Sequence, residues 1–442
     1  MGEIGQTLSR IVGAAAVLSG EQADPKLQEQ ISLAINPAAA TVPPVECIVY
    51  PSTQAELAAV MACACRQRWR VLPCGMGSKL DWGGLAAGAD LVVSTARLNR
   101  LVDHAVGDLT VTAEAGMGFA DLQSVLKAKG QFLALDPTWP ETATLGGIVA
   151  TADAGSLRQR YGGVRDMLLG LSFVRADGQM AKAGGRVVKN VAGYDLMKLL
   201  TGSYGTLSII SQVTFRVYPL PDASATVVLV GEGDAIATLT QTLLSSALTP
   251  VAVDLLSSQL VSALELGSGL GLAIQFQSVA ESVQEQSKRL LELAQSLSLQ
   301  SNLYSAAEET ALWKRLKQQI HSATPGSTIR CKIGVLPTEA VTSLQQLDRD
   351  FPQAALGLIH AGSGLGCLQL QAEGTQAAKI MALRSHLQTK GGFLSVLQAP
   401  SYLKQQLDIW GYSGNALPLM QKIKQKFDPQ VLLRPKRFVN GI

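Results

Sequence analysis

The chain has 442 residues, of which 47% are hydrophobic and 16% are charged, so it is long enough and apolar enough to bury the cores of two domains. This composition excludes a disordered chain. A net charge of only +3, spread over both halves, gives no basic footprint of the kind that binds nucleic acid, so we expect no nucleic-acid partner.

The N-terminus carries no signal for a membrane. Its first apolar stretch, 11–18, is much shorter than the roughly 20 residues that cross a bilayer, and Met1-Gly2-Glu3-Ile4 lacks the basic start of a secretory signal. We expect a cytoplasmic protein with no integral membrane segment, peripheral at a membrane only through its partners.

The cysteines and histidines do not form a metal-binding pattern. The six cysteines include no C-x-x-C pair, and the four histidines form no H-x-x-x-H or H-E-x-x-H array. We therefore expect neither an iron–sulfur cluster nor another metal site in this chain, and any redox chemistry needs a bound organic cofactor.

The first domain is predicted to cover 46–221, after an N-terminal helical segment at 1–45. Thr53 and Glu56 have the spacing of a capping box before an amphipathic helix. Strand-like runs follow at 70–72, 91–93 and 109–113, and a long alternating run covers 207–217. Pro219 and Pro221 then mark the domain boundary.

Beyond the prolines, two successive units have the strand-helix-strand-strand-helix order of ferredoxin-like folds. The first covers 226–297, and the second covers 329–387 with a closing strand at 393–397. Side by side they would form one antiparallel sheet with helices on one face, in a cap domain at 222–421. The predicted fold class is therefore α+β.

The C-terminal segment, 422–442, is rich in basic residues, with six Lys or Arg against one acid between 422 and 437. One interpretation is a solvated tail. The other is a segment that returns to the first domain or docks an acidic partner.

Two glycine-containing loops carry the first chemical signal. Gly75, Gly77 and Ser78 directly follow a strand, where glycines allow positive φ and bring backbone N–H groups close to phosphate oxygens. Each such loop alone is also typical of an ordinary turn. A second loop, Thr144-Leu145-Gly146-Gly147, about 60 residues later, strengthens the case for a diphosphate ligand.

The order of these motifs resembles the vanillyl-alcohol-oxidase/PCMH family of FAD-binding proteins. More narrowly, 77–83, 189–196 and 200–207 look like the E subunits of glycolate oxidases. The resemblance is dense over 46–219 and implies a two-part PCMH-type FAD-binding domain plus a cap. It also implies that FAD is held by Pro73, Gly75, Met76, Gly77, Ser78, Pro137, Thr144, Gly146, Gly147, Gly205 and Ile210.

Three departures from the family refine this expectation. Relatives with covalent flavin place a His where this chain has Gly77, so the FAD should be non-covalent. The related 2-hydroxyacid dehydrogenases carry a paired-histidine metal site in the cap, whereas this chain has the single His360. Many relatives end in Asn-Pro-Gly, and this chain places Arg434 and Lys436 at the Asn and Gly positions.

Oxidation of a 2-hydroxyacid needs a base, a cation for the carboxylate and a dry pocket. His360 is the candidate base, Arg330 with Lys332 the candidate cations, and Tyr194 a candidate neighbour of the flavin. Each also has a structural interpretation. His360 could simply be hydrogen-bonded at the end of a strand, Arg330 and Lys332 could lie on a solvated strand face, and Tyr194 could support its own helix. No catalytic residue is assigned.

Three functions remain open. The chain could be the FAD-binding subunit of a glycolate oxidase or dehydrogenase complex that converts glycolate to glyoxylate, with a D-type flavoprotein and an iron–sulfur subunit as partners. It could also be a self-sufficient dehydrogenase for D-lactate or another 2-hydroxyacid. The third alternative is a non-catalytic interaction subunit.

Overall fold

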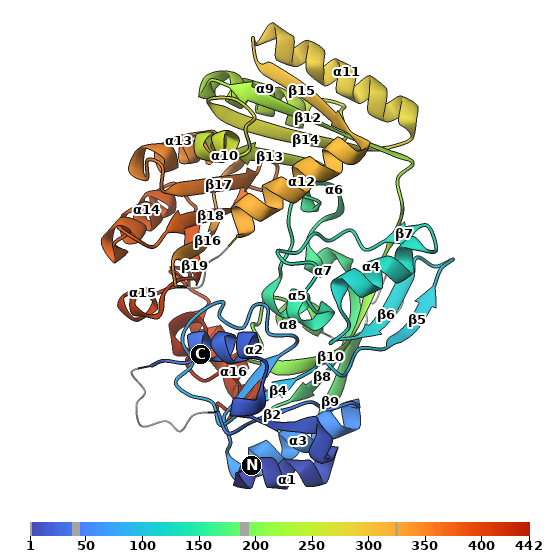
Figure 1. Ribbon diagram of the computed structural model, residues 1–442, viewed down its shortest axis with the longest axis vertical. Coiled ribbons are helices and arrows are strands. Elements are labelled where there is room, and N and C mark those ends of the chain that lie inside the picture. The colour runs from blue at the N-terminus through green and yellow to red at the C-terminus, as the bar shows by residue number, and fades with distance from the viewer. Residues whose placement is uncertain (1, 38–44, 186–193, 323–325) are drawn as a thin grey trace. The chain divides into compact units, whose positions relative to one another are not determined.

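The computed structural model describes residues 2–37, 45–185, 194–322 and 326–442, which form two compact units (Figure 1). The first unit consists of Met1–Ala154, Gly163–Leu220 and Tyr412–Ile442, and the second of Gly155–Gly162 and Pro221–Gly411. The short excursion Gly155–Gly162 therefore joins the second unit although it lies within the sequence range of the first domain.

The first unit contains a four-stranded sheet in the order β1-β2-β4-β3. Its strands are β1 (Val17–Ser19), β2 (Cys47–Val49), β4 (Leu91–Ser94) and β3 (Val71–Cys74). β2, β4 and β3 are parallel, and the apolar runs predicted at 70–72 and 91–93 form two of them. Strands of a parallel sheet are covered on both faces, which explains why these runs are continuously apolar.

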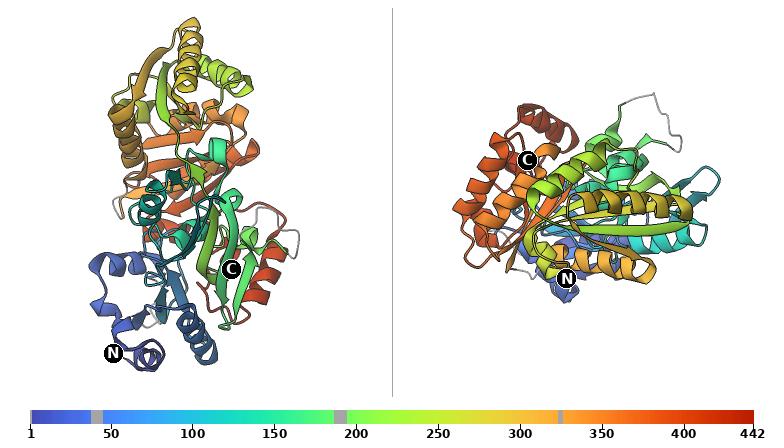
Figure 2. Two further views of the ribbon diagram at one scale, coloured as in Figure 1. Left: turned by 90° about the vertical axis from the view of Figure 1, so that its right-hand side faces the viewer. Right: turned by 90° about the horizontal axis from the view of Figure 1, so that it is seen from above.

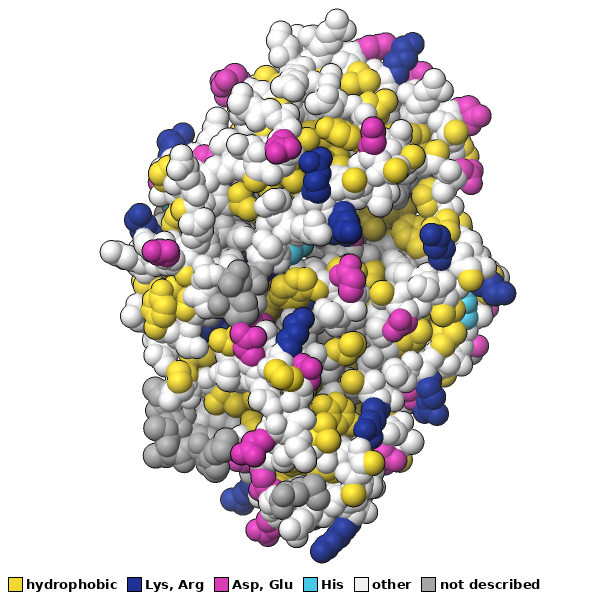
Figure 3. Space-filling view, in the orientation of Figure 1, with side chains coloured by type: hydrophobic (Ala, Val, Ile, Leu, Met, Phe, Trp, Pro, Cys, Tyr) yellow, Lys and Arg dark blue, Asp and Glu magenta, His cyan; other side chains and the backbone are white. Residues whose placement is uncertain are grey.

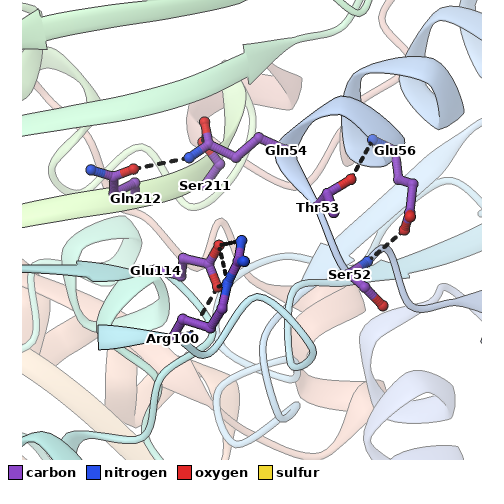
Figure 4. Close-up of polar contacts among 8 residues, drawn as sticks. All are labelled: Ser52, Thr53, Gln54, Glu56, Arg100, Glu114, Ser211 and Gln212. Carbon is purple, nitrogen blue, oxygen red and sulfur yellow. Dashed lines mark hydrogen bonds and ion pairs between the residues drawn. The ribbon is translucent and has the colours of Figure 1, made fainter. Parts of the chain in front are cut away.

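Helix α3 (Gln54–Gln67) begins where the capping pattern predicted. The Thr53 hydroxyl accepts from the Glu56 backbone N–H at 3.1 Å, while the Glu56 carboxylate accepts from the Ser52 N–H instead of the Thr53 N–H (Figure 4). The Gln54 amide donates to the Gln212 side chain at 2.9 Å, which ties the start of α3 to β10 (Ser208–Arg216).

β10 is the central strand of a five-stranded antiparallel sheet in the order β5-β6-β10-β8-β9. Its other strands are β5 (Leu101–Ala105), β6 (Thr110–Glu114), β8 (Leu168–Arg175) and β9 (Met180–Gly184). Arg100 forms an ion pair with Glu114 at the end of β6 (Figure 4). The alternating runs predicted at 109–113 and 207–217 are β6 and β10.

Short elements complete the first unit. They are α1 (Glu3–Val12), α2 (Pro25–Ala34), α4 (Phe119–Lys127), α5 (Leu145–Thr151), α7 (Val164–Met167), α8 (Leu196–Leu200), α16 (Leu417–Phe427) and the pair β7 (Gln131–Phe132) with β11 (Tyr218–Pro219).

The C-terminal segment is built into the first unit. The Val71 N–H donates to the Leu432 carbonyl, and the Arg434 N–H donates to the Val71 carbonyl, so this segment extends the edge of β3. Lys424, Arg434 and Arg437 are all buried. The solvated-tail interpretation is therefore wrong for these three residues, because the tail pairs with a distant strand edge.

The second unit is organised around one eight-stranded antiparallel sheet in the order β15-β12-β14-β13-β17-β18-β16-β19. β13 (Ala252–Leu256) pairs with β17 (Ala355–His360) and joins the two predicted ferredoxin-like units into one sheet. The remaining strands are β12 (Ala223–Gly231), β14 (Leu270–Ser278), β15 (Gln300–Ser305), β16 (Thr328–Gly334), β18 (Leu365–Gln371) and β19 (Phe393–Gln398).

Helices cover both faces of this sheet, so the expectation of helices on one face was wrong. Leu290 of α11 (Ala280–Ser296) packs into one core, and Leu312 of α12 (Ala306–His321) packs into the core on the opposite face. In the view from above, α11 in yellow and α12 in orange lie on opposite sides of the strands (Figure 2). The other helices are α6 (Arg158–Tyr161), α9 (Gly233–Ser245), α10 (Ser258–Ala263), α13 (Ala340–Asp350), α14 (Ala377–Thr389) and α15 (Ser401–Gln406).

The face drawn in Figure 3 has a mixed distribution of charge. On this face, basic and acidic side chains are interspersed, without a large area of either sign. Within the described part of the chain, no helix combines the length and the apolar character needed to traverse a bilayer.

Candidate functional site

A groove in the first unit collects the two predicted glycine loops. It holds roughly 670 Å³ of space, counted out to its open mouth. Its walls are Pro73, Cys74, Gly75, Met76, Gly77, Ser78, Lys79, Leu80, Thr95, Thr144, Gly146, Gly147, Ala150, Thr151, Tyr204, Gly205, Ser208, Ile209, Ile210 and Arg434. Every residue that the resemblance assigned to FAD lines this groove, except the buried Pro137.

The first loop leaves β3 at Cys74 and turns along the groove. Gly77 has a φ of 86°, a left-handed conformation that glycine adopts without strain. The Ser94 hydroxyl donates to the Gly75 carbonyl at 2.8 Å and fixes the loop against β4. A side chain at Gly75 would collide with Thr144, so its lack of a Cβ lets the two loops meet.

The second loop leads into α5. Thr144 caps this helix by accepting from the Gly147 N–H at 3.3 Å. A Cβ on Gly146 would come within 2.8 Å of the Ala115 methyl group, so glycine is required for this close approach. The two loops therefore form a narrow cradle. In the second loop, the N–H groups of Leu145, Gly146 and Gly147 are bonded within the protein.

Lys79 and Asp153 form a buried ion pair beside the groove, with Lys79 Nζ 2.5 Å from the carboxylate. The Thr138 N–H and hydroxyl both donate to Asp153 at 2.9 Å. Burial favours a higher pKa for Asp153, but the Lys79 ammonium and the Thr138 hydrogen bonds outweigh it and hold this pKa below its ordinary value. Asp153 is therefore a carboxylate that orients Lys79.

The chemistry of the groove fits the diphosphate of FAD. Its lining contains two cationic side chains, Lys79 and Arg434, the Ser78 hydroxyl, and no Asp or Glu. Flexible-backbone loops with free N–H groups are a common cradle for phosphate oxygens. The lining also contains no histidine, the residue type to which related covalent flavins are attached.

Several residues that line the groove were not predicted from the sequence. Lys79 directly follows the predicted Ser78, whereas Thr95 lies beyond the predicted strand at 91–93, and neither carries a separate motif. Arg434 comes from the C-terminal segment, which reaches the groove only through its pairing with β3. The 189–193 part of the resemblance lies outside the described residues, and the neighbouring Tyr194 is 91% exposed.

The second unit contains a separate polar cluster around His360, at the end of β17. His360 Nδ1 lies 2.6 Å from Asp254 Oδ1, and the Ser156 hydroxyl donates to Asp254 Oδ2 at 2.5 Å. Asp254 is fully buried in β13, and His360 is also buried. Because Ser156 bonds to the carboxylate and not to the imidazole, this arrangement is not a serine-hydrolase relay.

Arg330, the candidate cation for the substrate carboxylate, is buried and bonded to another residue of the protein. It is only 1% exposed, and its guanidinium donates to the His321 carbonyl at 2.7 Å and contacts the His321 ring. His360 and Arg330 lie in the same sheet, on β17 and β16, and are not bonded to each other. Among the described residues, no group of three His, Cys, Asp or Glu side chains is placed to hold a metal ion.

Residues 45–184 match a protein family described as FAD binding domain. The chain is similar to glycolate oxidase subunit GlcE of Escherichia coli (38% identity over 34% of this chain and 43% of that protein). It is also similar to subunit GlcD of Bacillus subtilis (27%, 51% and 48%). The chain thus spans about half the length of these two relatives.

A D-lactate dehydrogenase of Anaerostipes hadrus is similar over more of its length, with 26% identity over 88% of both chains. Among solved structures, p-cresol methylhydroxylase with substrate bound has a TM-score of 0.77, 14% identity and coverage of 98% of this chain and 96% of that chain. At this identity the likeness concerns the fold, and it confirms the predicted PCMH-type architecture. Residues 45–184 of this chain are therefore an FAD-binding domain, and the chain has the fold of PCMH-type flavoproteins.

Proposed function

We propose that this chain is the FAD-carrying subunit of a glycolate oxidase or dehydrogenase complex, which oxidises glycolate to glyoxylate. The observation that carries the proposal is the groove in which the 73–80 and 144–147 loops meet, inside the matched FAD-binding domain. The names of GlcE and GlcD support the substrate class. The groove residues would hold FAD without a covalent bond.

FAD supplies an acceptor for the two electrons and the hydrogen removed from the hydroxyl-bearing carbon. The protein must take up the hydroxyl proton, and His360 is the best candidate. With Nδ1–H donating to Asp254, the imidazole holds Nε2 available as a proton acceptor. Asp254 would be a positioning residue that fixes this tautomer.

The proposed partners are a D-type flavoprotein and an iron–sulfur subunit. The similarity to two differently named subunits, GlcD and GlcE, supports an assembly in which related chains divide the work. Electrons would pass from glycolate through flavin to the iron–sulfur subunit.

The proposal is tested by purifying the chain alone and together with candidate D-type and iron–sulfur partners. Each sample is mixed anaerobically with glycolate while flavin absorbance is followed at about 450 nm. We expect rapid bleaching only in the assembled complex. Unchanged glycolate oxidation by the partners without this chain would contradict the proposal.

A self-sufficient D-lactate dehydrogenase is the second candidate. It is favoured by the similarity to the Anaerostipes hadrus enzyme, which extends over 88% of both chains. Bleaching of the isolated chain by D-lactate would establish this alternative. A purified chain that binds no flavin would instead favour a non-catalytic interaction subunit.

A further inference from the structure

Arg434 is a buried cation in the wall of the FAD groove. Its side chain is 8% exposed, and Nη2 donates to the Pro73 carbonyl at 2.6 Å. Nε is buried without a hydrogen-bond partner. A Cβ built on Gly205 would lie 3.3 Å from this Nε, so the unsatisfied donor lies beside a residue that also lines the groove.

Within the described residues, no carboxylate lies within ion-pair distance of Arg434. The ionisable side chains that interact with it are Cys74, Tyr204 and the neighbouring cation Arg437. Burial raises the pKa of Cys74 to about 11 and moves the pKa of Tyr204 further above its ordinary value, so both are uncharged at neutral pH. Burial lowers the pKa of Arg434 only to about 10, so its guanidinium stays protonated.

The other buried cations near the groove have partners. Lys79 is paired with Asp153, and Arg437 interacts with the Asp81 carboxylate, which favours its charged form. A buried charge without a counter-charge is costly, whereas one that meets an anion in a desolvated site binds it strongly. Arg434 therefore has both the position and the charge of an anion ligand.

We propose that Arg434 binds the diphosphate of FAD in this groove and supplies a cationic ligand that the backbone of the glycine loops does not. Each phosphate of the diphosphate carries a negative charge and acceptor oxygens, and the free Nε–H can donate to one of them. Arg434 would hold FAD in this way whether the chain oxidises glycolate, D-lactate or no substrate.

The test uses the full chain stripped of flavin. Dissociation constants for FAD and for ADP, which has the diphosphate but no flavin, are measured by calorimetry for the wild type and for Arg434→Met. We expect both ligands to bind roughly ten- to a hundredfold more weakly to the variant. We also expect the melting temperature of the flavin-free variant to be unchanged or higher, because an uncompensated buried charge has been removed.

Arg434→Gln is measured in parallel, because it removes the charge but retains a donor for the Pro73 carbonyl. It replaces Arg434→Met in the test if that variant does not fold. The matched control is Arg384→Met. Arg384 is an equally buried arginine in the second unit whose donors bind the carbonyls of Leu394, Asp408 and Ile409. We expect this control to lower the melting temperature and leave the FAD dissociation constant unchanged.

Two outcomes would overturn the assignment. Wild-type FAD affinity in the Arg434 variants, with a lower melting temperature of the flavin-free protein, would reduce Arg434 to a structural support. Weaker binding of FAD with unchanged binding of ADP would place the guanidinium away from the diphosphate.

Discussion

The Arg434 guanidinium donates to the Pro73 carbonyl at 2.6 Å, across 361 residues of sequence. This bond fixes the C-terminal segment to the end of β3, where the first glycine loop begins. The last residues of the chain therefore help to build the FAD groove.

The contact between the glycine loops should limit the residues tolerated at position 75. We expect Gly75→Ala to weaken FAD binding by roughly tenfold or more, because the new methyl group collides with Thr144 and overpacking costs about 1–3 kcal/mol. Calorimetric FAD titration measures the effect. Gly107→Ala is the control, since a Cβ there meets nothing within 4 Å, and equal losses in the two variants would refute this account of the cradle.

The Lys79–Asp153 pair should stabilise the first unit in a pH-dependent way. We expect Asp153→Asn to cost roughly 3–5 kcal/mol of unfolding free energy at pH 7, because it leaves a buried ammonium without its partner. The native pKa of Asp153 is lowered, so its contribution is fully present above the ordinary Asp pKa, near 4, and is lost as the pH falls further through the native pKa.

Urea unfolding of the wild type and the Asp153→Asn variant at several pH values checks this prediction. The difference between the two proteins should be constant above about pH 5 and shrink in more acidic solution. Glu285→Gln is the control, because its pair with Arg289 is exposed and contributes about 0.5 kcal/mol or less. If the difference in unfolding free energy between the wild type and Asp153→Asn grew as the pH fell, the predicted pH dependence would be contradicted.

The His360–Asp254 contact predicts a selective loss of catalysis. We expect Asp254→Asn to slow flavin reduction in the assembled complex by roughly 100- to 10,000-fold, since the imidazole loses the acceptor that fixes its tautomer. FAD content and affinity should be unchanged, and the pH profile of flavin reduction should shift.

Ser156→Ala is the comparison for this cluster. It removes one hydrogen bond to Asp254 and leaves the contact with His360, so its effect on the rate and on the pH profile should be much smaller. Equal rates for wild type and Asp254→Asn would remove His360 as the candidate base.

The buried contacts of Lys424 indicate that the C-terminal segment is needed for stability. Its ammonium donates to the Thr206 carbonyl, the Asp428 carboxylate and the Leu433 carbonyl. We expect Lys424→Met to cost roughly 3–5 kcal/mol, because Asp428 is left as an uncompensated buried anion. Chemical denaturation measures the loss. Lys422→Met, at an exposed position of the same helix, should be nearly neutral, and similar losses in both would argue against the buried pair.

Local patterns predicted most strands, and together with the family resemblance they predicted the groove loops. Gly75, Gly77, Gly146 and Gly147 are informative because the lack of a side chain is a physical requirement of close backbone approach. The cap strands were predictable from their alternation and spacing, except the edge strand β15 (Gln300–Ser305), which was missed. Helix α12 was missed although Leu312, Leu316 and Ile320 give a helical period of four, a signal that was present in the sequence.

Long-range pairing could not be predicted in the same way. Arg434 reaches the groove because Leu433 pairs with Val71, a contact that no local pattern specifies. Asp254 and His360 meet because β13 pairs with β17 and joins two sequence units. The acidic residue within the apolar run Val253-Asp254-Leu255 indicated a buried polar contact, but the sequence did not show which residue would be its partner.

The most direct test of the account is the flavin content of the purified chain after FAD has been added and the excess removed. Absorbance near 450 nm is compared with protein concentration before and after heat denaturation and filtration. We predict one FAD per chain, recovered in the filtrate after denaturation. A chain that binds no FAD, or flavin that stays attached to the denatured protein, would contradict the account.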